Sequence, residues 1–220
     1  MLVVTAMAAP ACFDVHTVQP PTFVIDDFDD GDLQPSAANF AAWICYIFHT
    51  DPNGAGCTRD RDEGDHSPYS LSLSFTVHDP ADGTQQDVGA GLATYASQPE
   101  DLRRFLGLNF HIRLDSVMSP LPVDTVVDVE IGCQTATPAP GSSTLHNLYV
   151  LQSGRYTEAW QTIDLALADF VPPPEPTMAI AGGAPACLQL ADGIRFAVHP
   201  GLHDGDSAQG ILHVDDIYFE

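Results

Sequence analysis

Two pairs of adjacent aspartates interrupt apolar segments near the two ends of the chain. Asp26-Asp27 lies within the segment 24–28, and Asp215-Asp216 lies within the segment 213–217. In both segments the apolar residues that flank the pair are three positions apart, whereas a regular strand spaces its core residues by two. One extra residue in a strand is typical of a β-bulge. We therefore expect each pair to lie at a bulge, in two strands that are neighbours because chain ends often meet in a single domain.

An aspartate held between core residues costs free energy to bury unless it has a partner. Lysine is absent and arginine supplies all seven basic residues, so a metal ion is the natural candidate. Calcium prefers carboxylate and carbonyl oxygens, and Asp29, Asp30 and Asp32 follow the first pair. The segment is not an EF-hand loop, because Ala38 stands where that loop needs a glutamate. The alternative is that these aspartates lie in turns and face water. A second acidic segment, 60–65, is interpreted as a solvated run of charge.

No catalytic motif stands out among the many acidic and histidine residues. The sequence contains no Gly-x-Ser-x-Gly, no His-Glu-x-x-His and no phosphate-binding loop. The nine histidines are scattered, and Pro200-Gly201 separates His199 from His203. A glycosidase would need two carboxylates facing each other across a cleft, and no motif marks such a pair. We therefore predict that the chain is not an enzyme.

The clearest periodicity in the sequence is two, which indicates β-strands with one buried face. In the segment 70–78, for example, Leu71, Leu73, Phe75 and Val77 alternate with serine and threonine. About ten segments qualify as strands: 23–28, 43–49, 70–78, 89–95, 106–114, 127–133, 147–151, 160–165, 194–198 and 212–219. No ten-residue stretch has a convincing helical period, which excludes alternating strand-helix folds. We predict an all-β protein, an antiparallel β-sandwich or jelly roll, with one domain over residues 23–220.

Charge and the first residues set the expected partners and location. The formal charge of -23 disfavours nucleic acid and anionic lipid as partners. Residues 1–22 are interpreted as a truncated signal or lipoprotein-type leader with a linker, because an uncharged apolar run ends in Ala9-Pro10-Ala11-Cys12. Cys12 is then a candidate lipid anchor, which would be the chain's means of membrane attachment. We expect an extracellular or cell-surface monomer.

Four further cysteines follow the leader, and an even number in an exported protein indicates disulfides. The sequence permits three pairings of these residues. In one of them, Cys45–Cys57 closes a short loop and Cys133–Cys187 forms a long-range link. The spacings do not suit a zinc site, and no Cys-x-x-Cys occurs.

Several segments between residues 23 and 220 together match one known pattern. They are the acidic opening Ile25-Asp26-Asp27-Phe28-Asp29-Asp30-Gly31-Asp32, Trp43, the strand Tyr69–Phe75, Trp160, Gly193–Phe196 and Val214–Phe219. With these segments the chain resembles carbohydrate-binding modules that have a galactose-binding-like jelly roll, especially those related to bacterial β-glucanases. The resemblance implies a structural calcium between the terminal strands, with Asp27, Asp29 and Asp215 as its side-chain ligands. Asp29 departs from the family pattern, which more often has glutamate there.

A sugar-binding surface needs aromatic rings that stack on sugar C–H groups and polar side chains that reach the hydroxyls. Tyr95 and Tyr149 are the better aromatic candidates, because they lie at strand ends beside polar residues. Trp160 leads an apolar strand and is expected in the core. The further candidates are Trp43, Tyr46, Tyr69, Arg104, His111 and Arg113.

Together these features lead us to expect non-catalytic binding of a polysaccharide or oligosaccharide by an exported, calcium-containing jelly roll. The alternative is a cell-surface adhesion or protein-interaction sandwich without glycan specificity. The burial of the candidate aromatic residues separates the two hypotheses.

Overall fold

The computed structural model describes residues 22–51, 53–65, 67–80, 87–117, 119–134, 148–172, 182–203 and 205–220. The predicted leader, including the candidate lipid anchor Cys12, lies outside the described residues. Within them, no helix has the length and apolar character needed to cross a membrane.

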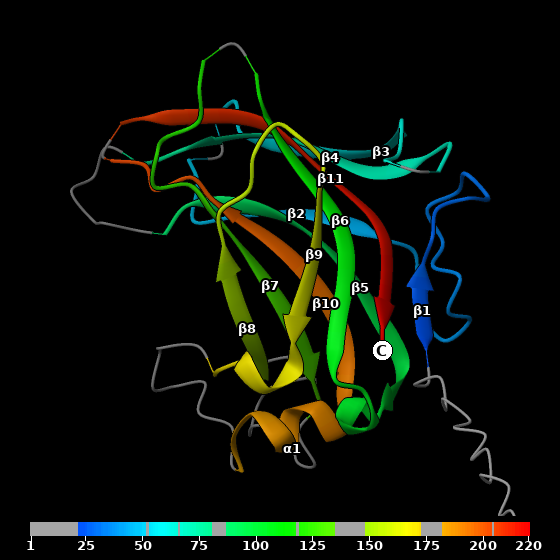
Figure 1. Cartoon of the computed structure of the whole chain (residues 1–220). Coiled ribbons are helices and arrows are strands. Elements are labelled where there is room, and N and C mark those ends of the chain that lie inside the picture. Colours follow the sequence, from blue (N-terminus) through cyan, green and yellow to red (C-terminus); the bar gives the residue numbers. More distant parts are fainter. Residues whose placement is uncertain are drawn as a thin grey trace, which may run out of the picture.

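The described residues form an all-β sandwich of two antiparallel sheets, as predicted (Figure 1). The strands are β1 (Phe23–Asp26), β2 (Ile44–Phe48), β3 (Gly56–Asp62), β4 (Ser70–His78), β5 (Gly89–Glu100), β6 (Gly107–Ser116), β7 (Val126–Cys133), β8 (Leu148–Gly154), β9 (Gln161–Ala166), β10 (Ala191–His199) and β11 (Ser207–Phe219). One sheet has the order β3-β4-β11-β6-β9, with β1 paired to β11, and we call it the six-stranded sheet. The other has the order β2-β5-β10-β7-β8, and we call it the five-stranded sheet.

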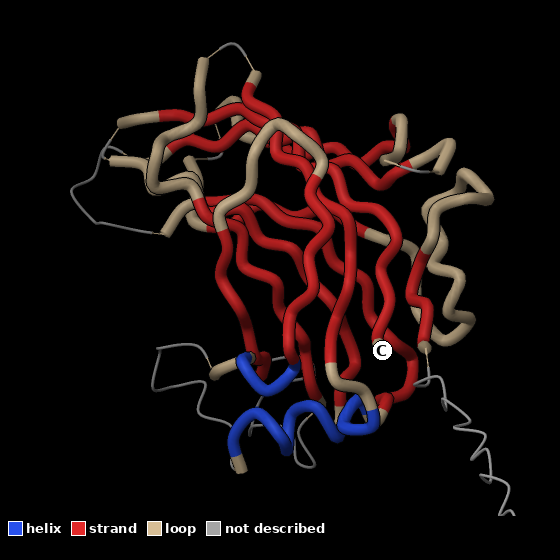
Figure 2. Tube along the Cα trace, viewed as in Figure 1, coloured by secondary structure: helices blue, strands red, loops and turns tan. Residues whose placement is uncertain are grey.

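Three short helical segments gather at one end of the sandwich (Figure 2). They are the 3-10 turns η1 (Leu102–Arg104) and η2 (Leu167–Asp169) and the helix α1 (Gly183–Gln189). The helix has only seven residues, which explains why no helical period is visible in the sequence.

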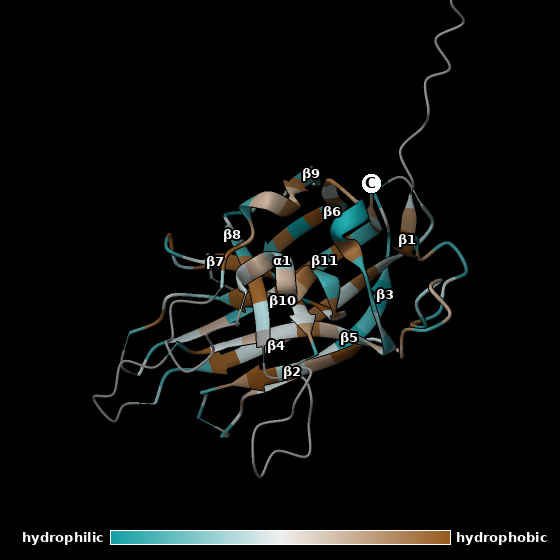
Figure 3. Cartoon of the chain, turned by 90° about the horizontal axis from the view of Figure 1, so that it is seen from below, coloured by the Kyte–Doolittle hydropathy of each residue, from teal (hydrophilic) through white to brown (hydrophobic). Residues whose placement is uncertain are grey.

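The period-two pattern decides which residues form the core. In β4 the side chains of Leu71, Leu73, Phe75 and Val77 are buried, and those of the alternate serines and threonines lie on the outer face. Strands such as β6 alternate in the same way between hydrophobic and hydrophilic residues (Figure 3). The buried faces of the two sheets form one continuous hydrophobic cluster, which holds the outer faces in fixed positions.

Both predicted bulges are present, and they lie side by side. The pairing of β1 with β11 shifts register between Val24 and Asp26. The pairing of β11 with β6 shifts between Asp215 and Tyr218. Because β1 pairs with the last residues of β11, the two terminal strands are neighbours, as the sequence predicts.

Two disulfides connect different elements of the fold. Cys45–Cys57 joins β2, the edge of the five-stranded sheet, to β3, the edge of the six-stranded sheet, with Cα atoms 6.1 Å apart. Cys133–Cys187 joins the end of β7 to α1, with Cα atoms 5.1 Å apart. Of the three pairings that the sequence permits, the structure has this one.

Candidate functional site

The outer face of the five-stranded sheet brings two predicted tyrosines into one row. Tyr95 on β5 pairs with Gly193 on β10, which pairs with Gly132 on β7, which in turn pairs with Tyr149 on β8. Residues that are paired across neighbouring strands point to the same face of a sheet. The two tyrosines are therefore separated by two positions without side chains, and both rings are partly exposed.

A charged pair occupies the next row of the same face. Arg195 on β10 pairs with Glu130 on β7, and the Arg195 Nε lies 2.6 Å from the Glu130 Oε2. The Arg195 guanidinium carbon lies 4.4 Å from the centre of the Tyr149 ring, and Arg195 also hydrogen-bonds Tyr95. The guanidinium group is thus held between the two tyrosines by an ion pair, a hydrogen bond and a cation–π contact.

Two more aromatic rings, from the edge strand β2, lie over glycines of β5. Tyr46 pairs with Gly91 and Phe48 pairs with Gly89. A Cβ atom on Gly91 would lie 2.5 Å from the Cζ and Oη atoms of Tyr46, so the ring rests directly on the glycine backbone. The Tyr46 and Phe48 rings have their centroids 6.1 Å apart, which extends the aromatic surface along the edge of the sheet.

Burial and charge keep these groups in defined protonation states. Burial raises the pKa of Tyr46 and of Tyr95, so both phenols stay protonated and can donate as well as accept hydrogen bonds. Burial also raises the pKa of Glu130, while the Arg195 guanidinium beside it acts in the opposite direction. The pair with Arg195 is what allows a carboxylate to sit at a position where only 5% of the residue is exposed.

A cluster of acidic residues around a histidine continues the face beyond the charged pair. Asp128 lies two residues before Glu130 on β7, and its Oδ2 lies 3.4 Å from the Nε2 of His199 on β10. The other ring nitrogen of His199 lies 2.7 Å from an oxygen of Asp87. Within the described ranges, Asp128, Glu130 and His199 are the one group of three or more His, Cys, Asp or Glu residues with ligand atoms within 4.8 Å of one another.

The arrangement combines flat aromatic surface with fixed polar groups. The tyrosine rings can stack on apolar faces of a ligand, and Arg195, Glu130 and the phenols can hydrogen-bond its polar edges. This combination is typical of a site that binds a flat ligand with many hydroxyl groups.

Two of the residues predicted to bind ligand, Tyr95 and Tyr149, lie on this face, but Trp43 does not. The Trp43 side chain is fully buried, packs against Phe28 and Phe196, and donates its indole N–H to Asp26. The structure therefore corrects the expectation that Trp43 stacks on a ligand, because no part of its ring is accessible.

Tyr69 and Arg104 lie apart from the five-stranded face. Tyr69 immediately precedes β4 in the six-stranded sheet, is 37% exposed and has the Arg61 guanidinium carbon 5.3 Å from its ring centre. Arg104 belongs to η1, and its guanidinium carbon lies 4.8 Å from the ring centre of Phe105. The structure does not bring either residue together with Tyr95 and Tyr149.

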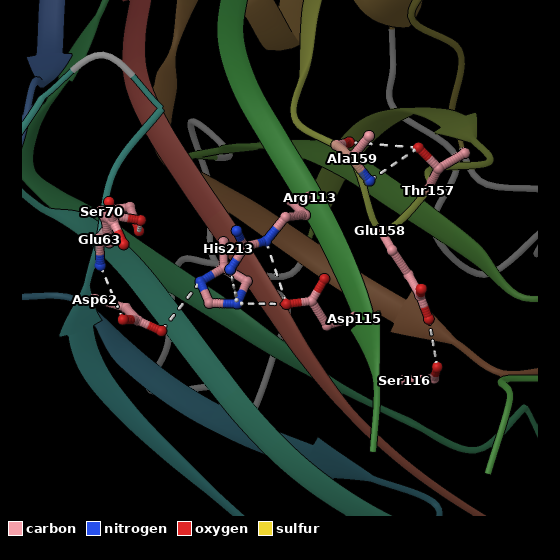
Figure 4. Close-up of polar contacts among 10 residues, drawn as sticks. All are labelled: Asp62, Glu63, Ser70, Arg113, Asp115, Ser116, Thr157, Glu158, Ala159 and His213. Carbon is pink, nitrogen blue, oxygen red and sulfur yellow. Dashed lines mark hydrogen bonds and ion pairs between the residues drawn. The ribbon is translucent and has the colours of Figure 1, made fainter. Parts of the chain in front are cut away.

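His111 and Arg113 share the outer face of the six-stranded sheet, on the opposite side of the sandwich. His111 lies 3.3 Å from an oxygen of Asp65. Arg113 contacts Asp115 and His213, whose ring lies between Asp115 and Asp62 (Figure 4). These residues form an ion-pair network of their own.

Trp160, expected in the core, instead lies at the border of this network. It is partly exposed, and the Arg113 guanidinium carbon lies 5.1 Å from its ring centre.

The structure does not assemble the three predicted calcium ligands into a metal centre. Asp29 is exposed on the loop after β1, whereas Asp215 is buried in β11. The Oδ2 of Asp215 accepts hydrogen bonds from the Asp65 backbone N–H and the Ser67 hydroxyl. Asp27 accepts hydrogen bonds from the backbone N–H of Asp29 and from the Ser36 hydroxyl. The oxygens of these three carboxylates do not gather within 4.8 Å of one another, and calcium binding stays a prediction.

The buried aspartate of the first pair has two hydrogen-bond partners within the protein. Asp26 accepts hydrogen bonds from the Trp43 indole N–H at 2.9 Å and from the Phe28 backbone N–H at 3.1 Å. Burial raises its pKa to about 7, an effect that these two hydrogen bonds oppose. At Asp26 the indole of Trp43, on another segment, is thus a partner that the sequence reasoning did not foresee.

Two residues of the candidate face, Glu130 and Arg195, were not predicted as site residues, whereas Tyr46 was among the aromatic candidates. Glu130 and Arg195 each stand between apolar core residues in a strand, Val129 and Ile131 in one case and Ile194 and Phe196 in the other. A single charged residue on the outer side of an otherwise apolar strand is the sequence feature from which Glu130 and Arg195 could have been predicted as site residues.

Two solved structures have a fold similar to that of this chain. The chain is similar to a family 11 carbohydrate-binding module from Clostridium thermocellum in complex with a β-1,3-1,4-mixed-linked tetrasaccharide, with 17% identity and a TM-score of 0.56 over 90% of this chain and 94% of that one. It is also similar to the family 11 module of a cellulosomal cellulase of Clostridium thermocellum, with 19% identity and a TM-score of 0.55 over 91% and 95%. No protein-family model and no curated protein sequence matches the chain.

The chain has the jelly-roll fold of a carbohydrate-binding module. This confirms the fold that the sequence resemblance implied. At these levels of identity the likeness concerns the fold, so function has to be argued from the residues of the face.

Proposed function

We propose that the outer face of the five-stranded sheet binds a polysaccharide or oligosaccharide, and that the chain is a non-catalytic carbohydrate-binding module. The observation that carries the proposal is the row that contains Tyr95 and Tyr149, with the Arg195–Glu130 pair in the row beside it. Aromatic rings bind sugar C–H faces, and a fixed guanidinium-carboxylate pair donates to and accepts from hydroxyl groups.

The shape and charge of the face favour a neutral, extended glycan. The glycines at positions 132 and 193 lie buried beneath the Tyr95 ring and an Asp192 oxygen, so the face between the two tyrosines consists of these side chains and of the Arg195 guanidinium. Glu130 and Asp128 on the face, and the formal charge of -23 on the whole chain, would repel an acidic polysaccharide. The likeness in fold to a module in complex with a β-1,3-1,4-mixed-linked tetrasaccharide supports a β-glucan as the first ligand to test.

We further propose that the protein acts outside the cell. Its two disulfides support this location, since disulfides persist in oxidising compartments. The lipid anchor at Cys12 and the monomeric state stay predictions.

Calorimetric titration of the whole chain with a soluble mixed-linkage β-glucan tests the proposal. Tyr149→Ala removes one stacking ring and the cation–π partner of Arg195, so we expect the affinity to fall by about tenfold or more. Tyr95→Ala should have a similar effect, because it removes the ring at the other end of the row.

Tyr69→Ala is the matched control. Tyr69 is also a partly exposed tyrosine with an arginine over its ring, but it lies outside the candidate face. Its substitution should leave the affinity unchanged. Equal affinity of Tyr149→Ala, Tyr95→Ala and the unmodified chain would contradict the proposed face. A folded chain that binds no polysaccharide would favour the adhesion alternative.

A further inference from the structure

Besides the tyrosines and the Arg195–Glu130 pair, the five-stranded face carries His199 among acidic residues. The residue ends β10 and lies beside β7, which contributes Asp128 and Glu130. Asp87, two residues before β5, approaches the ring from the other side. The imidazole thus has acidic groups on both sides, and this part of the face adjoins the tyrosine row and shares Glu130 with the charged pair.

The hydrogen bond to Asp87 determines which nitrogen of His199 carries a lone pair. The Nδ1 lies 2.7 Å from the Asp87 Oδ2, so the Nδ1–H donates to that carboxylate. In a neutral ring the Nε2 is then an acceptor, and it is buried without a hydrogen-bond partner. It lies 3.4 Å from the Oδ2 of Asp128, which is also an acceptor. Two acceptors at this distance repel each other unless a cation lies between them.

The separation between His199 and Asp128 matches that between two ligands of one metal ion. Two ligand atoms about 2.1 Å from a metal and at a tetrahedral angle lie about 3.4 Å apart, and the separation between His199 and Asp128 is 3.4 Å. Glu130 contributes a third ligand atom within 4.8 Å of the other two.

Each of the three ligand side chains is oriented by a further polar group. Asp87 holds the Nδ1–H of His199, the Ser153 hydroxyl donates to the Oδ1 of Asp128, and Arg195 contacts the Oε2 of Glu130. Metal-binding histidines and carboxylates are held in this way by groups outside the coordination sphere. Because a carboxylate has two oxygens, Glu130 can pair with Arg195 through one oxygen and coordinate a cation through the other.

We propose that Asp128, Glu130 and His199 bind a divalent transition-metal ion of the zinc class. One imidazole nitrogen with two carboxylates suits zinc better than calcium, which prefers six to eight oxygen ligands. Three protein ligands leave a fourth position, and the side chains of Asp128 and His199 are each 15% exposed, so water or a ligand hydroxyl can fill it. The inference concerns metal binding alone and does not depend on the proposed glycan binding.

Titration of the chelator-stripped whole chain with Zn²⁺, followed by calorimetry at neutral pH, tests the proposal. We expect one site, an affinity for Zn²⁺ at least tenfold above that for Ca²⁺, and at least a tenfold loss of Zn²⁺ affinity in His199→Ala. Asp128→Asn should give a similar loss, and its smaller change in shape provides a second variant in case the first unfolds. Circular dichroism establishes that each variant is folded.

Asp115→Asn is the matched control, because Asp115 also lies beside a histidine, 3.2 Å from the Nε2 of His213, but on the other sheet. This variant should keep the Zn²⁺ affinity of the unmodified chain. Unchanged affinity in folded Asp128→Asn and His199→Ala would overturn the proposal. So would a titration without a stoichiometric site, which would leave a proton as the cation between His199 and Asp128.

Discussion

At the scale of single residues, glycine decides how the aromatic rings lie on the candidate face. Gly91, Gly132 and Gly193 occupy positions on central strands where other residues would project a side chain outward. The Tyr46 ring takes the space above Gly91, and the Tyr95 ring approaches Gly193, where a Cβ atom would lie 2.8 Å from its Cδ1. A glycine in a strand usually weakens the strand, and here it permits close contact between a ring and the backbone.

Gly91→Ala should therefore displace Tyr46. The new methyl group would lie 2.5 Å from the ring and 2.8 Å from the Phe196 carbonyl oxygen, so either the ring or the strand must move. We expect a loss of about 1–3 kcal/mol in the free energy of unfolding, measured by chemical denaturation. Gly56→Ala is the control, since no atom lies within 4 Å of a Cβ at that position. Equal stability of the two variants would show that the Tyr46 ring does not rest on the sheet.

Individual residues also show what the sequence could predict about the site. The sequence predicts Tyr95 and Tyr149 as binding residues because each lies at a strand end beside polar residues. Their meeting with Arg195 depends on the pairing of β10 with both β5 and β7, which joins segments about 60 to 100 residues apart. Period-two patterns reveal which side of a strand a residue occupies, but they do not reveal which strands are neighbours.

At the scale of elements, ten predicted segments correspond to strands, and β3 was missed. In its sequence, Gly-Cys-Thr-Arg-Asp-Arg-Asp, apolar and polar residues do not alternate. The charged half therefore indicates a solvated run of charge and not a strand. The strand pairs along its whole length with β4 and has no partner on its other side within the described sheet. An edge strand with mostly exposed side chains needs no buried face, and charge on an edge prevents pairing with other chains.

The two disulfides should differ in their contribution to stability. Cys133–Cys187 spans 54 residues of sequence and Cys45–Cys57 spans 12, so opening the longer loop frees more chain entropy in the unfolded state. Loop-entropy arguments give a cost of about 4 kcal/mol for replacing the long-range pair with serines and about 3 kcal/mol for the short one. Denaturation of the two double-serine variants measures the difference. A larger loss for the Cys45–Cys57 pair would mean that its link between the two sheets matters more than loop length.

At the scale of the whole molecule, the first and last strands of the sandwich, β1 and β11, are paired with each other. The segment after β1 and the bulge of β11 carry a concentration of aspartates in a chain with a formal charge of -23. Local hydrogen bonds already engage many of them: Asp30 accepts from the backbone N–H of Asp32, and Asp32 accepts from that of Gln34. These contacts are turns of the kind that aspartate forms with its own backbone, which was the alternative to calcium binding.

Chelation distinguishes calcium binding from turn formation at the chain ends. If calcium joins the loop after β1 to β11, EDTA should lower the melting temperature, because an ion that binds only the folded state stabilises it. At a calcium concentration about one hundred times the dissociation constant the loss is about 2.7 kcal/mol, or about 5–10 °C for a chain of this size. The measurement belongs in the His199→Ala background, so that the proposed transition-metal site does not contribute. Recovery with Ca²⁺ but not with Zn²⁺ would support calcium, whereas a melting temperature insensitive to EDTA would leave the aspartates as turn residues whose partners are backbone N–H groups.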